Sequence, residues 1–184
     1  MQNVLTGTLP MRGDLRIVVR RVDTGAVHWR YQIRNTITTV GLKSVVSLLA
    51  QVTSLTDPKD YQVKYLRVGT GTTPPTRADT NLNAVVTAIG DTHPYTLDLL
   101  DANKTLTVVN PFELKLTASI PAGVLNGVTL TEAGLFTRGN ALVIQPPGQY
   151  LGYWPELFAR QIHPAILKDP AFVVDYDWRI AFTA

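Results

Sequence analysis

Cysteine is absent from the 184-residue chain, which excludes a disulfide scaffold and any metal site built on thiolates. No stretch reaches the roughly 20 consecutive apolar residues of a membrane-spanning helix, and residues 1–7 lack the basic and apolar regions of a secretory signal. Only 17% of the residues are charged, whereas 45% are hydrophobic, which excludes a disordered chain. We therefore expect one globular domain over residues 1–184, with no membrane contact.

Branched side chains dominate the composition. The chain contains 23 Thr, 20 Val and 9 Ile, which favour the pleated surface of a β-sheet. Twelve Pro and 13 Gly lie between the apolar runs and supply turns. The composition alone predicts an all-β protein.

The basic residues are concentrated near the start of the chain. Residues 1–34 hold six Arg and two Asp, and the rest of the chain is almost neutral. Two β-like runs, at residues 15–22 and 26–34, flank a short loop that contains Gly25. This pattern predicts a basic N-terminal hairpin over residues 1–35, with a solvated charged face. Because no pattern of stacking aromatic residues accompanies the arginines, we do not expect nucleic-acid binding.

One segment has the spacing of a helix. Apolar residues at positions 42, 45, 46, 49 and 50 predict an amphipathic helix, with Thr38 or Thr39 as its N-cap. Alternating or β-rich patterns predict further strands at residues 61–68, 95–100, 105–109, 112–120, 128–136, 141–144, 157–162 and 172–182. The runs at 95–100 and 105–109 are expected to pair as a second hairpin, and residues 79–89 fit either helix or strand.

These elements define a fold class. About nine or ten strands with frequent turn signals, and no alternation of strands with helices, are typical of an antiparallel sheet protein. We expect an all-β fold, an antiparallel β-sandwich of jelly-roll-like form, with the one amphipathic helix packed against it or closing one end.

The Gly-Thr-Gly-Thr-Thr sequence at residues 69–73 is the one motif that resembles a phosphate loop. Such a loop needs a Lys-Ser or Lys-Thr pair and a following helix. Pro74 and Pro75 follow instead, and they disfavour the helix N-terminus that would receive a phosphate. We expect a tight turn after a strand and no cofactor.

Other catalytic and metal-binding residue types are sparse. His28, His93 and His163 lie in separate segments without metal-ligand spacing, so no metal site is expected. Asp175 and Asp177 share one face of the last strand, where they could serve a glycan depolymerase as acid and base. Their alternation with apolar residues favours the solvated outer face of a strand instead. We expect no catalytic residue and no enzymatic activity.

Glu132 stands out among the acidic residues because Leu130, Ala133 and Leu135 surround it. It is either an ordinary outward-facing residue or a partly buried carboxylate. A buried carboxylate needs a cation or backbone donors, since an unpaired buried charge is expensive. Arg160 and Lys168 are the candidate cations.

Trp154 is the one tryptophan that strand alternation does not turn inward. Trp29 and Trp178 fall on the apolar faces of their predicted strands, whereas Trp154 lies in a loop rich in Pro and Gly. Trp154 is therefore the candidate platform for a host glycan.

After the predicted helix, several segments follow in a distinctive order: LRVGTGTTPPT at residues 66–76, DTNL at 79–82, TEAGLF at 131–136, LFAR at 157–160, PAILK at 164–168 and WRIAF at 178–182. The ordered set resembles a module of tailed-bacteriophage virion proteins, often labelled tail-fibre, collar or baseplate-associated, over roughly residues 36–184. Members usually have an acidic residue and Arg after the Asp-Thr-Leu segment, where this chain has NAVV at residues 83–86.

The resemblance implies a structural component of the virion, in the collar, tail or fibre apparatus. Such a protein would form a homo-oligomer and dock on neighbouring virion proteins. The resemblance also singles out Arg160 as the basic residue that matches Glu132, and Arg can hold a carboxylate with two hydrogen bonds. Two alternatives stay open: a capsid-decoration protein of the same fold, and a carbohydrate-binding module of a receptor-binding fibre.

Overall fold

The structure, a computed structural model, describes residues 11–50, 62–87, 94–99, 105–110, 113–138 and 155–182. Its elements are β1 (Met11–Arg21), β2 (Val27–Ile37), α1 (Thr39–Ala50), β3 (Val63–Gly69), β4 (Thr96–Asp98), β5 (Thr105–Asn110), β6 (Glu113–Ile120), β7 (Thr129–Thr137), β8 (Leu157–Leu167) and β9 (Phe172–Phe182). Neighbouring strands run antiparallel, so the predicted antiparallel β-protein with one helix is confirmed. None of the described residues forms a helix long and apolar enough to cross a membrane.

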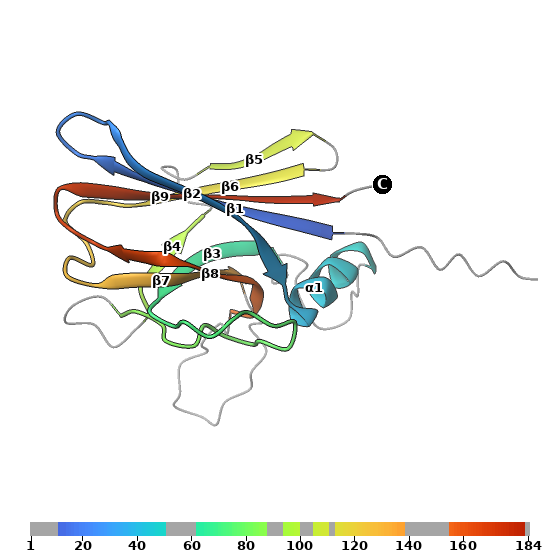
Figure 1. The fold of residues 1–184 in the computed structure, drawn as a ribbon. Helices are drawn as coiled ribbons and strands as arrows, with labels where there is room; N and C mark the ends of the chain where they lie inside the picture. Colours follow the sequence, from blue (N-terminus) through green and yellow to red (C-terminus); the bar gives the residue numbers. More distant parts are fainter. Residues whose placement is uncertain are drawn as a thin grey trace, which may run out of the picture.

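The nine strands form one continuous sheet in the order β4-β3-β7-β8-β2-β1-β9-β6-β5. Figure 1 shows the sheet folded over, with β5, β6, β9 and β1 in one layer and β3, β4, β7 and β8 in the other. β2 passes between the two halves, since it pairs with β1 along most of its length and joins β8 through Thr36 and Ile37. Because one strand belongs to both halves, the sheet is barrel-like rather than a clearly defined sandwich.

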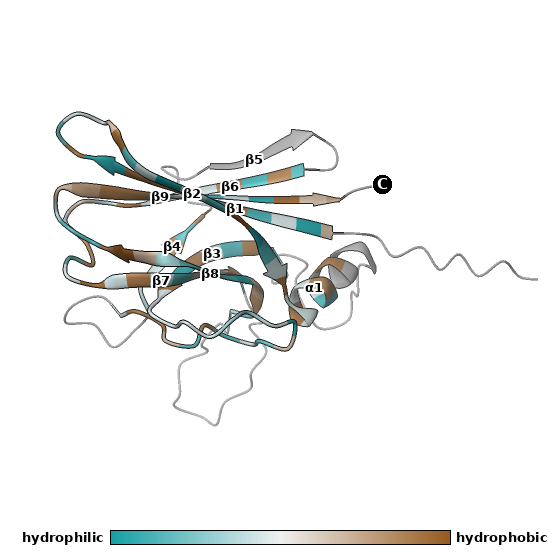
Figure 2. Ribbon diagram, viewed as in Figure 1, coloured by the Kyte–Doolittle hydropathy of each residue, from teal (hydrophilic) through white to brown (hydrophobic). Residues whose placement is uncertain are grey.

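The core lies between the two halves of the sheet. Inward-facing residues of β1 alternate with outward-facing ones, and Leu15 and Ile17 are fully buried. β9 pairs with β1 over its whole length and contributes Trp178, also fully buried. Figure 2 shows the corresponding changes between hydrophilic and hydrophobic residues along these strands. The period of two in the sequence therefore decides which face of each strand meets the core.

Helix α1 covers one end of the sheet beside β8. Thr38 is its N-cap, because the hydroxyl oxygen accepts a hydrogen bond from the Gly41 N–H at 3.0 Å. The same hydroxyl donates to the carbonyl of Leu157, which ties the start of the helix to β8. Leu42 and Val45 pack on the core, as their spacing predicted.

The prediction that residues 95–100 and 105–109 pair as a hairpin is wrong. β4 pairs with β3, where Leu66 lies opposite Leu97, whereas β5 pairs with β6. Leu97 and Leu99 are buried in the core, so packing places β4 in the other half of the sheet from β5. The described part of the ambiguous segment, residues 79–87, is mostly loop, with isolated bridges between Gly69 and Val85 and between Thr87 and Pro94. The strand predicted at residues 141–144 lies outside the described residues.

We predict that Gly41→Ala weakens the contact between α1 and β8. A methyl group on Gly41 would overlap the backbone carbonyl of Phe158, which belongs to a buried strand. The free energy of unfolding, measured in urea, should fall by roughly 1–3 kcal/mol. The control is Gly123→Ala, where a methyl group meets nothing within 4 Å, and it should change stability by less than about 0.5 kcal/mol. Equal unfolding midpoints for both variants would contradict this packing.

Candidate functional site

A buried ion pair lies between β7 and β8. Glu132 on β7 and Arg160 on β8 are both fully buried. The Arg160 Nε donates to Glu132 Oε2 at 2.9 Å, and Nη2 lies 2.8 Å from the same oxygen. The structure thus brings together the two residues selected from the sequence, although both nitrogens reach a single carboxylate oxygen.

The remaining acceptor capacity of Glu132 is used by the loop at residues 70–84, which follows β3. Oε1 accepts hydrogen bonds from the backbone N–H groups of Gly71 at 3.1 Å and Ala84 at 2.8 Å. Oε2 accepts another from the N–H of Asn83 at 3.2 Å. Three backbone donors and one guanidinium surround the carboxylate, so its charge is compensated although it is buried.

Arg160 extends the network to a second carboxylate. Its Nη1 donates to Asp79 Oδ2 at 2.8 Å, and Nη2 donates to the carbonyl of Thr73 at 3.0 Å. Partial burial acts to raise the pKa of Asp79, but hydrogen bonds from Thr76 and Arg160 outweigh it and hold that pKa below its usual value. We call Glu132, Arg160 and Asp79 the clamp, because together they attach the 70–84 loop to β7 and β8.

The clamp explains the Gly-Thr-Gly sequence. A Cβ on Gly69 or on Gly71 would lie 2.5 Å from Glu132 Oε1, so neither position has room for a side chain. The amide of Gly71 already binds a carboxylate of the same chain. The motif is thus an internal anion-binding turn, filled by Glu132, which agrees with the expected strand-to-loop turn.

Lys168, the other candidate partner of Glu132, is buried elsewhere. Its Nζ donates to the carbonyls of Ala122 and Asp169, each at 3.1 Å, and to Asn126 Oδ1 at 3.3 Å. Burial lowers the pKa of Lys168 below its usual value. This lysine holds the turn before β7 against the end of β8.

The histidines do not meet in the described structure. His28 is exposed on β2 beside the ring of Phe172, whereas His163 is buried on β8 with its ring centroid 6.0 Å from that of Tyr176. No three His, Asp or Glu side chains gather as a metal site within the described ranges. His93 and the candidate glycan platform Trp154 lie outside them.

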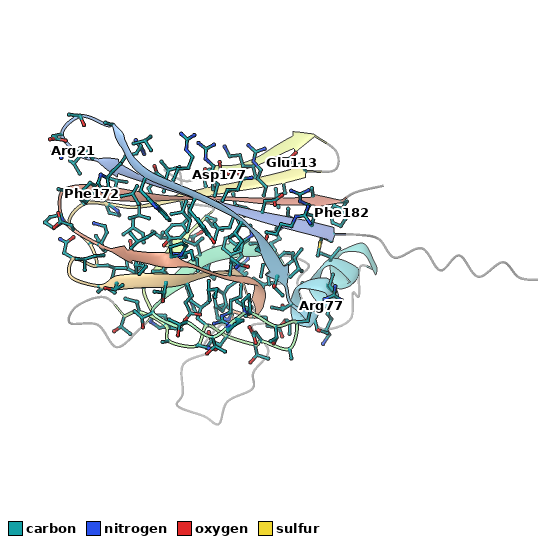
Figure 3. The ribbon with its side chains drawn as sticks, viewed as in Figure 1. Arg21, Arg77, Glu113, Phe172, Asp177 and Phe182 are labelled. Carbon is teal, nitrogen blue, oxygen red and sulfur yellow. The ribbon has the colours of Figure 1, made fainter. Side chains whose placement is uncertain are left out.

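Asp175 and Asp177 lie on the outer face of β9, and Figure 3 labels Asp177 there. Asp175 forms an ion pair with Arg20 and accepts the Ser119 hydroxyl at 2.6 Å. Asp177 lies 3.2 Å from the Lys115 ammonium. Each carboxylate therefore faces a basic residue of a neighbouring strand, which is a cross-strand charge pattern rather than a paired acid and base.

Comparisons with family models, with curated proteins and with solved structures found no match for this chain.

We predict that Glu132→Ala strongly destabilises the fold. The change removes the main partner of the buried Arg160 and leaves three backbone N–H groups without their acceptor. Unfolding in urea should show a loss of roughly 3–5 kcal/mol. The control, Arg12→Ala, removes an exposed pair with Asp14 and should cost less than about 1 kcal/mol. A Glu132→Ala protein as stable as the control would disprove the structural role of the clamp.

We also predict that His163 makes stability decline in mild acid. Burial is the largest influence on this ring and lowers its pKa below the ordinary 6.5, against smaller opposing effects of the Pro164 carbonyl and Glu132. The unfolded chain then binds the proton more readily, so stability falls as the pH drops below about 6.5 and levels off below the folded pKa. His163→Gln should flatten the unfolding midpoint between pH 7 and pH 5. His28→Gln, at an exposed position, should retain the wild-type slope, and identical slopes in all three proteins would contradict the prediction.

Proposed function

We propose that the chain is a structural component of a tailed-bacteriophage virion, in the collar, tail or fibre apparatus. It would act by self-assembly and by docking on neighbouring virion proteins. One observation carries the proposal: segments that give the sequence its resemblance to such proteins supply the clamp and its loop. Residues 66–76 and 79–82 supply most of the loop, including Gly71, Thr73 and Asp79, and residues 131–136 and 157–160 supply Glu132 and Arg160.

The position of the clamp supports an architectural role. Glu132 and Arg160 are fully buried and bind only other parts of this chain among the described residues. Segments that converge on such a buried network specify how the loop attaches to the sheet. The segments that carry the resemblance therefore hold the loop against β7 and β8. Such an arrangement suits a protein that acts through the shape of its surface, as in symmetric assemblies.

We also propose that the fold is a sandwich of jelly-roll-like form. The two halves of the sheet face each other across one core (Figure 1), and neighbouring strands run antiparallel. These features support grouping the fold with sandwiches in which one strand joins the two layers.

We predict that the purified full-length protein forms a homo-oligomer of fixed size by analytical ultracentrifugation, with a ring or spike in negative stain. The chain should also be detected by mass spectrometry in purified particles of the phage that encodes it. Gold-labelled antibodies should mark one vertex or the tail, whereas labelling over the whole head would indicate the decoration protein. A protein that stays monomeric and is absent from particles would overturn the proposal.

A further inference from the structure

One edge of β2 carries no neighbouring strand over most of its length. Residues 27–35 pair with β1 on one side. On the other side β2 joins β8 through Thr36 and Ile37, and no other pairing of that edge occurs among the described strands. The backbone groups of residues 27–35 on this edge are thus available to a further strand.

The inward-facing side chains of β2 are incompletely covered. Trp29, Tyr31 and Ile33 are only half-buried, whereas their partners on β1, which are Val19, Ile17 and Leu15, are at most 5% exposed. The sheet continues past β1 to β9, but nothing among the described strands continues it past residues 27–35. The core is therefore less closed on the β2 side.

A pocket opens beside this edge. It has a volume of about 280 Å³ and lies at the start of β2, where its walls include His28 and Trp29 together with Ile166 of β8 and Phe172 of β9. We call residues 27–35 of β2, together with this pocket, the β2 seam. The seam offers backbone hydrogen-bonding groups and apolar contact area at the same place, which are the two requirements for binding an extended segment.

Two of the outward-facing side chains of the seam are arginines. Arg30 and Arg34 are exposed on β2, and neither forms an ion pair with another described residue. These two arginines are four positions apart, so they project from the same face of the strand.

The opposite side of the same hairpin shows which kind of strand fits next to such arginines. β9 lies along β1 and presents Asp175 and Asp177 on the outer face, where Asp175 pairs with Arg20 and Asp177 stands opposite Arg16. Tyr176, which lies between them, and Trp178, which follows Asp177, turn inward and are buried. Residues 174–178 of β9 thus alternate apolar and acidic residues beside the arginines of β1. On β2, Arg34 lies opposite Asp14 of β1, which pairs with Arg12, and the other edge of β2 has no acidic neighbour along residues 27–35 among the described strands.

We propose that the β2 seam binds an extended segment of a partner protein in which acidic and apolar residues alternate. The apolar residues would cover Trp29 and Tyr31, and acidic residues four positions apart would face Arg30 and Arg34. The charges favour this occupant over the first ten residues of a second copy, which contain no acidic residue. The aromatic residues of the seam turn inward, which disfavours stacking with nucleic-acid bases. The inference does not depend on the proposed virion role.

The test uses the full chain and a fluorescein-labelled peptide of nine residues. In this peptide valine alternates with threonine and glutamate, and the two glutamates are four positions apart. Fluorescence anisotropy should show saturable binding that weakens as the salt concentration rises. A peptide with lysine in place of both glutamates should bind at least about tenfold more weakly. A glutamate peptide with a central proline should also lose binding, because proline cannot complete the strand hydrogen bonds.

Variants locate the site. The double change Arg30→Glu and Arg34→Glu should weaken binding of the glutamate peptide at least about tenfold and reverse the preference in favour of the lysine peptide. The control is Arg77→Glu in the 70–84 loop, which changes an exposed charge outside the seam, beside α1 (Figure 3), and should leave binding within about twofold. Matching unfolding midpoints would show that both variants fold.

Three results would overturn the proposal. The first is equal binding of the glutamate and lysine peptides, or no binding of either. The second is tighter binding of a single-stranded oligonucleotide than of the glutamate peptide. If the Arg30 and Arg34 variant loses that binding, the seam is a nucleic-acid surface. The third concerns an oligomer of the chain. If the Arg30 and Arg34 substitutions dissociate it while the glutamate peptide leaves it intact, the seam is an interface between copies of the chain.

Discussion

The buried carboxylate of Glu132 is the constraint on which one half of the fold depends. A charge in that position requires compensation, and among the described residues Arg160 and the 70–84 loop together supply the donors. Such a network need not add stability relative to an apolar core. It does limit the loop to one arrangement, because a shift of the loop would remove three backbone donors from a buried charge. The clamp therefore fixes how the loop lies against β7 and β8.

β2 gives the other half of the fold its particular shape. Its last residues join β8 and close the sheet into a barrel-like form, whereas its earlier residues diverge from β8 and leave the seam. The closure and the opening are thus consequences of one strand that is shared between two layers. A long strand can serve both halves because the sheet twists along its length.

The clamp and the seam have complementary roles in the proposals. The clamp attaches the 70–84 loop to β7 and β8 and so limits that part of the surface to one arrangement. The seam leaves main-chain groups available, and such an edge risks association with unrelated strands. Arg30 and Arg34 reduce this risk, because their charges oppose basic strands and copies of the same edge. The same charges favour an acidic partner, so protection of the edge and selection of a partner arise from the same residues.

Sequence alone determined the elements that depend on local periodicity. The alternation from Phe172 to Phe182 predicted β9, and apolar spacing with a threonine cap predicted α1, because strand and helix periods repeat within a few residues. The apolar neighbours of Glu132 indicate a carboxylate that is either outward-facing or partly buried, with Arg160 or Lys168 as its cation, and the resemblance to virion proteins singles out Arg160. Gly69 and Gly71 are the sequence signal for the loop, and from the sequence they predict a turn but not the carboxylate that fills it.

Tertiary structure decided the rest. The amides that bind Glu132 belong to the backbone, which every residue carries, so no side-chain pattern marks Gly71, Asn83 and Ala84 as donors. β4 joined β3 because core packing outweighed the local turn signal that predicted its pairing with β5. The barrel-like closure rests on contacts between Thr36 and Arg160, residues far apart in the chain. Such contacts form only when distant segments pack together. Their free energy depends on residues that are far apart in the sequence, so no local pattern of residues predicts them.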